Sequence, residues 1–525
     1  MPGAILSAHL NSAIRNYALL FFGCGLFHLA GTWNLPLIDR DEPRFAEASR
    51  EMIQRADYVV PYFNNQLRLD KPPLAYWAQV GSYRLFGESD FSARFPSVIA
   101  AALTALVIFA WGSRIGAAKV GWWAAIIFAL SLQTFLHAKA AVADMWLVLF
   151  MTIAHWAGYE LCLARPAAPL ANTFGGAPYQ QMRWWLTFYF ALALGFLAKG
   201  PIAWTPLLTA GSIMCFARGL QLSHRFKFGR GVLLTLAIVA IWGIPALIGT
   251  QGQFLVVGIG RHVLDRSFAT MEGHGANSFG MYLLLLPFYF VTIFVSFFPW
   301  SIKLPWLTKM LWRKQEASVT PQSRGYNARD NIDNYLIAGV AIIFIIFALV
   351  RTKLPHYTLP AFPLLALLLA RHWSKEEAMV GSSEEFREPR RRSLFRNIVI
   401  VTAGLWVAIA LIVPPLVSRS FPAYALFQES RTYLRPDMQF ASVDFQEPSL
   451  VWYFRSILNS FLTPLNKRRA SEYMTEPGPR LVIVPTPLVG MLFANHPQTW
   501  KFFSTRGFNI AKGKRVDLTL VLKPE

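Results

Sequence analysis

The stretch GVLLTLAIVAIWGIPALIGT, residues 231–250, contains no charged side chain. About 20 apolar residues in a helix are enough to cross the hydrocarbon core of a bilayer. Comparable apolar runs recur along the chain and give about eleven candidate spans, at 17–35, 92–111, 120–136, 142–162, 184–198, 200–217, 231–250, 279–300, 335–350, 355–371 and 396–417. Because some of these runs lie close together, we expect 11–13 transmembrane helices.

The composition agrees with a membrane protein. Of the 525 residues, 54% are hydrophobic and only 15% are charged, against roughly 25% charged in a soluble domain. The mean hydropathy is +0.37. A soluble multidomain enzyme, a disordered chain and a disulfide scaffold are therefore excluded. The net charge of +21 would favour nucleic acid in a soluble protein, but here basic loops that orient membrane helices explain it better.

The basic residues define the topology. Four loops are rich in Lys and Arg, at 112–119, 218–230, 301–333 and 372–396. Strict alternation through eleven spans puts all four on the same side, which the positive-inside rule assigns to the cytoplasm. The predicted protein therefore crosses the membrane many times, with these four loops in the cytoplasm.

The opposite, extracytoplasmic side collects the ionisable residues that lie close to the membrane. Its segments are a long first loop at 36–91, short tips near 137–144, 198–200 and 351–357, and the segment 251–278. The tips carry Lys139, Asp144, Lys199, Lys353 and His356. Because intramembrane charge is costly, such residues usually line a cavity. The pattern predicts one polar site at the outer mouth of the bundle.

The tail changes character at about residue 418. Short β-rich runs at 437–445, 449–455, 481–486 and 515–522 are separated by gaps long enough for helices, which is typical of a small α/β domain. We therefore expect a transmembrane domain at 1–417, including the loop 36–91, and an extracytoplasmic α/β domain at 418–525.

Two segments of the first loop carry the clearest local signals. The stretch from Asp39 to Met52 predicts a helix, with Pro43 at the first helical position and acidic residues before it. Its apolar and charged residues divide into two faces, so the helix should lie along the membrane surface. A solvated, capped helix explains the same pattern. Further on, Pro72 and Pro73 fix an extended approach after Lys71 and begin a second helix with interfacial aromatics at 76, 77 and 83.

With these segments in view, the chain resembles the bacterial membrane glycosyltransferases of the C-type fold. More narrowly, it is similar to the group that includes the lipid A aminoarabinose transferases and the protein O-mannosyltransferases. The residues that carry the resemblance run in order from residue 39 to about 455. They are Asp41 to Glu47, Lys71 to Leu74 with Tyr76 and Trp77, the lone acid Asp144, Ala198 to Pro201, Lys353 to Pro360, and Glu447 to Val451.

The resemblance implies an inverting glycosyltransferase. It would move a sugar, with 4-amino-4-deoxy-L-arabinose as the first candidate, from an undecaprenyl-phosphate-type carrier to lipid A or another envelope acceptor. The alternative in the same class is a protein O-mannosyltransferase that uses polyprenyl-phosphate mannose and acts on secreted proteins. A transporter of lipid-linked sugars is a third reading, but it predicts charges on both sides of the bundle or two related halves. Neither feature is evident in the sequence.

By resemblance, Asp41 is the acid of the first loop, and Asp41 and Asp144 are the candidate catalytic residues. The leaving group is a lipid phosphate of low pKa, so the site needs positive charge rather than a general acid. The candidate ligands of the donor phosphate are Arg44, Lys71, Lys199, Arg261, Arg266 and Tyr357. Accessory candidates are Glu42, Asp70, Lys353 and His356.

No ligand set for a metal is convincing in the sequence. His262, His274 and His356 read as hydrogen-bonding residues, and no cofactor is assigned, although a divalent metal is left open because a few family members use one. The expected partners are the polyprenyl-phosphate sugar donor, a lipid A-like glycolipid or secreted protein as acceptor, and membrane lipids, without nucleic acid.

Overall fold

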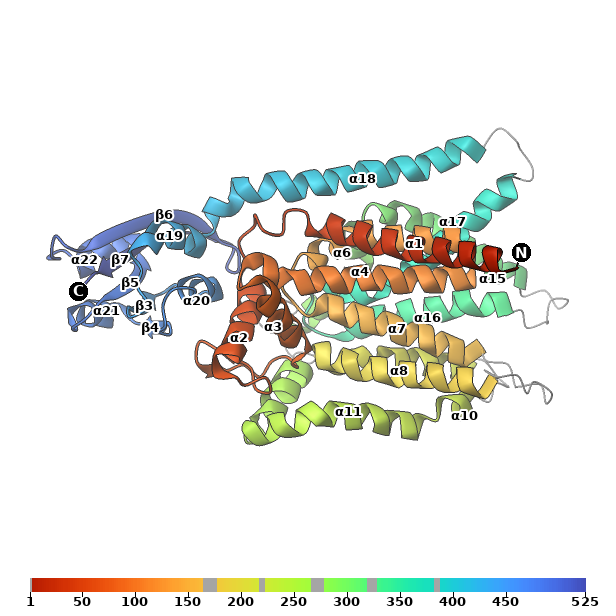
Figure 1. Ribbon diagram of the computed structural model, residues 1–525, viewed down its shortest axis with the longest axis horizontal. Helices are drawn as coiled ribbons and strands as arrows, with labels where there is room; N and C mark the ends of the chain where they lie inside the picture. The colour runs from red at the N-terminus through yellow and green to blue at the C-terminus, as the bar shows by residue number, and fades with distance from the viewer. Residues whose placement is uncertain (1, 164–176, 217–221, 266–277, 319–327, 382–387) are drawn as a thin grey trace.

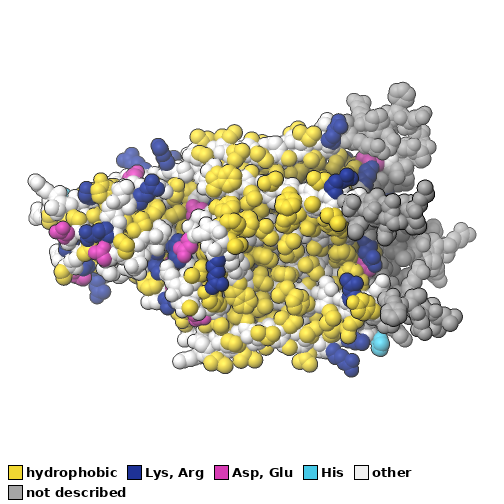
Figure 2. Space-filling view, viewed as in Figure 1, with side chains coloured by type: hydrophobic (Ala, Val, Ile, Leu, Met, Phe, Trp, Pro, Cys, Tyr) yellow, Lys and Arg dark blue, Asp and Glu magenta, His cyan; other side chains and the backbone are white. Residues whose placement is uncertain are grey.

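The computed structural model describes residues 2–163, 177–216, 222–265, 278–318, 328–381 and 388–525. Its larger part is a bundle of long helices, and its smaller part is an α/β domain at one end of the bundle (Figure 1). Hydrophobic side chains cover the bundle surface, and Lys and Arg gather towards its two ends (Figure 2). This distribution is the one a bilayer requires.

The bundle is formed by helices that follow the apolar runs. The long helices are α1 (Pro2–Leu29), α4 (Asp90–Ile115), α7 (Asp144–Leu163), α8 (Ala177–Lys199), α11 (Phe228–Gly249), α16 (Ala328–Leu349), α17 (Phe362–Gly381) and α18 (Glu388–Val417). Shorter or interrupted elements complete it: α5 (Ala118–Leu130), α6 (Leu132–Ala138), η1 (Pro201–Trp204), α9 (Thr205–Phe216), α10 (Leu222–Phe226), the π-helix Phe254–Asp265, α13 (Phe279–Leu284), α14 (Phe288–Ser296), η3 (Trp300–Lys303), α15 (Leu304–Ser318) and η5 (Pro355–Ala361). Every predicted span overlaps a helical segment, although the first, 17–35, continues six residues past the end of α1 at Leu29.

Within the described residues, five helices are long and apolar enough to cross a membrane, and α5 with α6 makes a sixth if this pair, bent by 69°, counts as one span. Other predicted spans are built from short pieces, such as η1 with α9 and α13 with α14. The chain is therefore a multi-pass membrane protein, while the count of 11–13 stays a prediction. The basic loop between α4 and α5 lies at the end of the bundle opposite to the α/β domain, as does α10 (Figure 1).

The first loop folds as a compact layer across that other end. It contains α2 (Asp41–Arg55), a hairpin of two short strands, β1 (Tyr62–Phe63) and β2 (Gln66–Leu67), and α3 (Leu74–Phe86). Both predicted helices are present, although α2 begins at Asp41, two residues before the predicted start at Pro43. Helix α2 runs across the bundle axis (Figure 1). The solvated alternative for α2 is wrong, because Glu47, Arg50 and Glu51 are almost completely buried.

The C-terminal domain is a five-stranded sheet of order β4-β3-β5-β7-β6. The strands are β3 (Gln439–Val443), β4 (Thr463–Leu465), β5 (Arg480–Pro485), β6 (Lys501–Asn509) and β7 (Lys514–Lys523). Pairing is parallel on both sides of β3 and antiparallel on both sides of β7. The helices are α19 (Pro422–Ser430), α20 (Pro448–Phe454), α21 (Lys467–Thr475) and α22 (Val489–Leu492). Alternating residues face α20 (Phe440) and α21 (Ala441, Val443), so the sheet is buried on both faces.

One predicted strand of the tail is wrong. Residues 449–455 form α20 and the turn after it, with Pro448 at the first helical position, where the ring fits and the missing N–H costs nothing. All residues of α20 are buried, because the helix lies between the sheet and the first loop. A helix apolar on every side has no periodicity to distinguish it from a buried strand. Strands β4 and β6 were not predicted.

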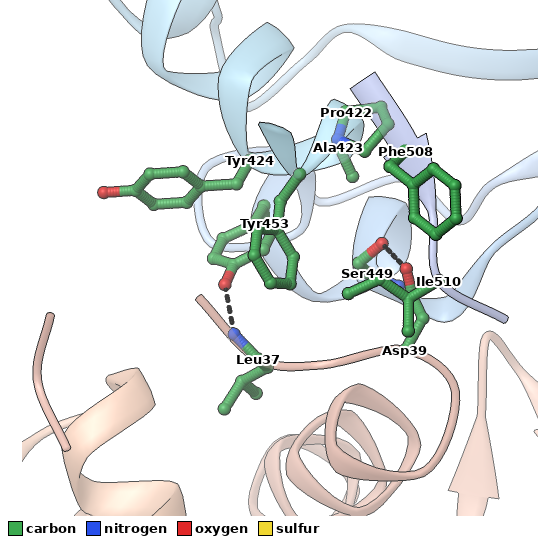
Figure 3. Close-up of a pocket in the computed structure, with 10 residues that line it drawn as sticks. Leu37, Asp39, Pro422, Ala423, Tyr424, Ser449, Tyr453, Phe508 and Ile510 are labelled. Atoms are coloured by element: carbon green, nitrogen blue, oxygen red, sulfur yellow. Dashed lines mark hydrogen bonds between the residues drawn. The ribbon is translucent and has the colours of Figure 1, made fainter. Parts of the chain in front are cut away.

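The core under α20 also contains residues of the first loop, among them Leu37, Ala46 and Tyr83. Tyr76 and Tyr83 both lie on α3, and both are buried rather than interfacial, contrary to the prediction. Figure 3 shows the junction: Tyr453 of α20 accepts a hydrogen bond from the backbone N–H of Leu37 at 2.8 Å, and Asp39 accepts from the Ser449 hydroxyl at 2.6 Å. Burial raises the pKa of Asp39 to about 6 against the effect of these hydrogen bonds. The loop and the C-terminal domain therefore share one core.

Candidate active site

An ion pair joins two helix ends at the end of the bundle that faces the first loop. Helix α7 begins with Asp144 and its antiparallel neighbour α8 ends with Lys199. Lys199 Nζ lies 2.5 Å from Asp144 Oδ1, and both side chains are mostly buried. An acid at a helix N-terminus and a cation at a helix C-terminus each interact favourably with the helix dipole. Gly200, at φ 82°, then turns the chain into η1, in a backbone region that favours glycine.

Two histidines complete this group. His137 comes from the end of α6 and His356 from η5, and one ring nitrogen of each lies within 4.8 Å of the other and of an Asp144 oxygen. His137 Nδ1 lies 2.9 Å from the Gln133 amide, and the two imidazole rings are 4.9 Å apart. Tyr357 follows His356 and packs on Phe347. His137 was missed by the sequence interpretation, since six residues of helix end and loop separate it from Asp144.

The two imidazoles and the carboxylate are ligand types that bind zinc. The ammonium of Lys199, however, lies on Asp144 at hydrogen-bond distance. A cation placed among these three side chains would face that positive charge and would have to share the carboxylate with it. The arrangement therefore fits a hydrogen-bonded ion pair better than a metal centre, and no step of the mechanism below passes through a metal.

Glu42 links the first loop to this group. Its two carboxylate oxygens each accept a hydrogen bond of 2.8 Å from Arg94, and they also accept from the backbone N–H groups of Ala141 and Ile38. Glu42 and Arg94 are both buried. With its acceptor positions occupied, Glu42 positions the start of α2 against the segment that leads into Asp144. The accessory role predicted for Glu42 is thus one of support in this structure.

Asp41, the first residue of α2, is exposed beside Glu42. It interacts electrostatically with Arg68, whose Nε donates to the Tyr76 hydroxyl at 2.8 Å and lies 3.2 Å from an oxygen of Asp70. Lys71 follows directly, with its Nζ 3.2 Å from the Asp70 carbonyl oxygen. These contacts form a second charged group, and Arg68 is its member that the sequence interpretation missed.

The π-helix Phe254–Asp265 packs against this second group. A Cβ at Gly258 would lie 2.9 Å from the Leu69 carbonyl oxygen, so glycine permits the close approach. The helix carries Arg261, whose side chain lies outside the described part of the chain, as does residue Arg266. Both therefore remain predicted phosphate ligands. Arg44, on the first turn of α2, lines a separate cavity described below.

The structure brings together Asp144, Lys199, His356 and Tyr357 at the mouth of the bundle, and Asp41, Asp70 and Lys71 in the adjacent loop. Glu42 connects the two groups. That all of them line one pocket stays a prediction.

Lys353 has a different position from the one expected of a site residue. Its Nζ donates to the carbonyl oxygens of Phe347, Ala348 and Val350 at 2.6–3.0 Å. Carbonyl oxygens at the end of a helix such as α16 have no donor within the helix. Burial lowers the pKa of Lys353 to about 8. Lys139 similarly donates to the carbonyl oxygens that end α1. Both lysines cap helices.

We expect Lys353→Met to lower the stability of the protein by about 1–3 kcal/mol, because it leaves buried carbonyl oxygens without a donor. The KM for a lipid-linked donor should change less than twofold. Thermal unfolding in detergent and steady-state kinetics check both effects. A large rise in the donor KM without loss of stability would show that Lys353 acts in the substrate site instead.

With this geometry in place, comparisons with known proteins show what the chain is similar to. Residues 70–244 match the family model described as dolichyl-phosphate-mannose-protein mannosyltransferase. The fold is that of ArnT from Cupriavidus metallidurans. The structure bound to undecaprenyl phosphate matches with a TM-score of 0.72 and 18% identity, over 96% of this chain and 98% of that chain. The apo structure matches with a TM-score of 0.68 and 19% identity, over 97% and 98%.

Similar curated proteins are named for one particular sugar. The undecaprenyl phosphate-alpha-4-amino-4-deoxy-L-arabinose arabinosyl transferase of Aeromonas hydrophila is 27% identical over 406 residues, covering 77% of this chain and 66% of the relative. That of Aeromonas salmonicida is 28% identical over 411 residues with the same coverage. The chain thus spans about two thirds of the length of these relatives. The resemblance to the aminoarabinose and O-mannosyl transferases is confirmed, as is the fold class.

Proposed function

We propose that the protein is an inverting glycosyltransferase of the bacterial inner membrane. It moves a sugar, with 4-amino-4-deoxy-L-arabinose as first candidate, from an undecaprenyl-phosphate-type carrier to lipid A or a related envelope acceptor. One observation carries the proposal: the Asp144–Lys199 pair, two imidazoles and the first loop converge at a single end of the bundle. The names of the similar transferases support the substrate class.

The periplasmic orientation of the site follows from charge. Four described basic residues lie in or beside the ends of α4, α5 and α10, at the bundle end opposite to the first loop: Arg114, Lys119, Arg225 and Lys227. The positive-inside rule assigns that end to the cytoplasm. The first loop, Asp144 and the C-terminal domain then face the periplasm.

In the proposed reaction, the acceptor oxygen attacks the anomeric carbon while the bond to the carrier phosphate breaks, which inverts that carbon. The departing phosphate is already a weak base, so it needs cations rather than a proton donor. Lys199 and Lys71 lie at the bundle mouth and in the first loop, where they can contact it. Asp144 keeps the ammonium of Lys199 in position through the 2.5 Å contact.

The role of Asp41 depends on the acceptor. If a hydroxyl attacks, the exposed carboxylate of Asp41 can take its proton. If a phosphate of lipid A attacks, no base is needed, and Asp41 orients the sugar or stabilises positive charge that develops at the anomeric carbon. The match of residues 70–244 to the mannosyltransferase model favours, as second candidate, protein O-mannosylation, in which the acceptor is a hydroxyl.

The decisive test is transfer by the Asp41→Asn variant, purified in detergent and supplied with donor and acceptor. We expect turnover to fall by about 100-fold or more, as is typical when an acid–base or positioning group is lost. Stability should be unchanged because Asp41 is exposed. Asp437→Asn, an exposed acid of the C-terminal domain, is the matched control and should keep full activity. Undiminished turnover by Asp41→Asn would refute its role.

A further inference from the structure

A cavity of about 500 Å³ lies between the first loop and the C-terminal domain. Arg40 and Arg44 form its wall on the side of the first loop, and Glu447, Asn466 and Lys512 line it on the side of the C-terminal domain. Its volume is in the range of small-molecule sites. Arg44 is a predicted ligand of the donor phosphate, but the proposed reaction uses Lys71 and Lys199 for that phosphate and gives this cavity no role.

The cations of the cavity are only loosely paired. Arg40 Nε lies 3.6 Å from one oxygen of the buried Glu447, and Lys512 Nζ lies 3.7 Å from the other. The close partner of Glu447 is instead the Asn509 amide, at 2.8 Å. One buried carboxylate thus faces two cations at distances too long for a good hydrogen bond. These cations can hold a further anion without losing a strong contact.

The remaining charges leave the cavity positive. Asp444, the second acid in the lining, is half-exposed and lies 3.6 Å from Lys467, a cation outside the lining. Arg44 adds a third cation, and the N-terminal turn of α2 adds the positive end of a helix dipole. An anionic group is therefore the ligand that these charges favour.

The cavity opens next to the proposed reaction site. Arg40 and Arg44 flank Asp41 on the first turn of α2, and Asp41 is itself exposed. A molecule bound between them and the C-terminal domain would present its neighbouring groups to Asp41. The position outside the bundle, beyond the ends of the helices, suits the head group of a lipid that stays in the membrane.

We propose that this cavity binds a phosphate of the acceptor lipid's head group, distinct from the position that receives the sugar, with Lys512 and Arg40 as its ligands. The inference rests on the proposed function and deepens it, because it assigns acceptor selection to the junction between the first loop and the C-terminal domain. The donor's phosphate binds elsewhere, at Lys71 and Lys199.

The test compares Lys512→Gln with Lys514→Gln in the full-length protein. Lys514 lies two residues further on, is also exposed and does not line the cavity, so the control makes the same charge change in the same domain. The probes are bisphosphorylated lipid A and its monophosphorylated forms, each lacking one phosphate. We expect Lys512→Gln to raise the KM for bisphosphorylated lipid A about tenfold, the cost of one charge-assisted contact. The donor KM and kcat should not change.

The monophosphorylated forms identify the group that is recognised. The form that lacks the docking phosphate but still accepts the sugar should have a raised KM with the wild-type protein and no further rise with Lys512→Gln. Lys512→Arg should restore most of the wild-type KM for the bisphosphorylated form. An unchanged KM in Lys512→Gln, an equal effect of Lys514→Gln, or a rise in the donor KM would overturn the proposal.

A binding measurement separates this inference from the proposed function. Native mass spectrometry counts bisphosphorylated lipid A bound to the detergent-purified protein without any turnover. Less bound lipid A in Lys512→Gln but not in Lys514→Gln supports the site even if the wild-type protein transfers no sugar, an outcome that would count against the proposed function alone. Equal binding by both variants overturns the site.

Discussion

The Lys199→Met variant should lose transfer activity by at least about 100-fold in kcat/KM, the scale seen when one group that stabilises developing charge is removed. It should also unfold more readily, because Asp144 is left mostly buried without its ammonium partner. Single-turnover kinetics with the lipid-linked donor and thermal unfolding in detergent measure the two effects separately.

The double variant Asp144→Asn/Lys199→Met distinguishes a functional ion pair from a structural one. Removing both charges removes the unpaired buried charge, so we expect stability close to that of the wild type. Activity should stay lost, because the cation that we propose contacts the donor phosphate is absent. Recovery of activity together with stability would show that the pair only holds α7 to α8.

The second large effect is expected at Glu47, in the middle of α2. Glu47 is completely buried and binds two arginines, Arg50 of the same helix and Arg455 at the end of α20. Glu47→Ala leaves both guanidinium groups buried with one partner fewer. We expect a loss of about 3–5 kcal/mol, typical of breaking a buried ion pair from one side. Thermal and urea unfolding of the purified protein measure the loss.

Glu88→Ala is the matched control for Glu47. Glu88 accepts from Nε of the same Arg50 at 2.6 Å but is about one third exposed. Water can therefore replace much of what it contributes, and its removal should cost about 1 kcal/mol or less. Equal losses in the two variants would contradict a buried network that joins α2 to the C-terminal domain.

A comparison of α7 with α20 explains which helices could be predicted from the sequence. Helix α7 was expected because a long apolar run in a lipid environment has to satisfy its own backbone hydrogen bonds, which leaves helix as the solution. Asp144 and Lys199 were then assigned to one end of the bundle by alternation and charge alone. Helix α20 has no such constraint: its run of Leu450 to Phe454 fits strand and helix equally well until its neighbours are known.

The charged face of α2 was misread for a similar reason. Glu47, Arg50 and Glu51 have the spacing of a solvated face, and nothing in residues 39–52 indicates that Arg455, some 400 positions later, packs against them. Glu42 and Arg94, or Asp144 and His137, are likewise partners only because two separate elements end at the same place. Such pairs leave no local pattern.

Local chemistry along the chain was thus sufficient for the membrane class and for the positions of most helices. The sidedness of the loops, from their charge, and the candidate site residues, mostly from the resemblance, stay predictions. These features depend on how each segment meets lipid or water, which is set by its own side chains. The three-dimensional packing alone decided that Lys353 caps a helix, that His137 joins Asp144, and that the first loop and the C-terminal domain share a core beside a cationic cavity. Those outcomes depend on distances between segments far apart in the chain, and burial changes the energetic value of a charge only after such segments have met.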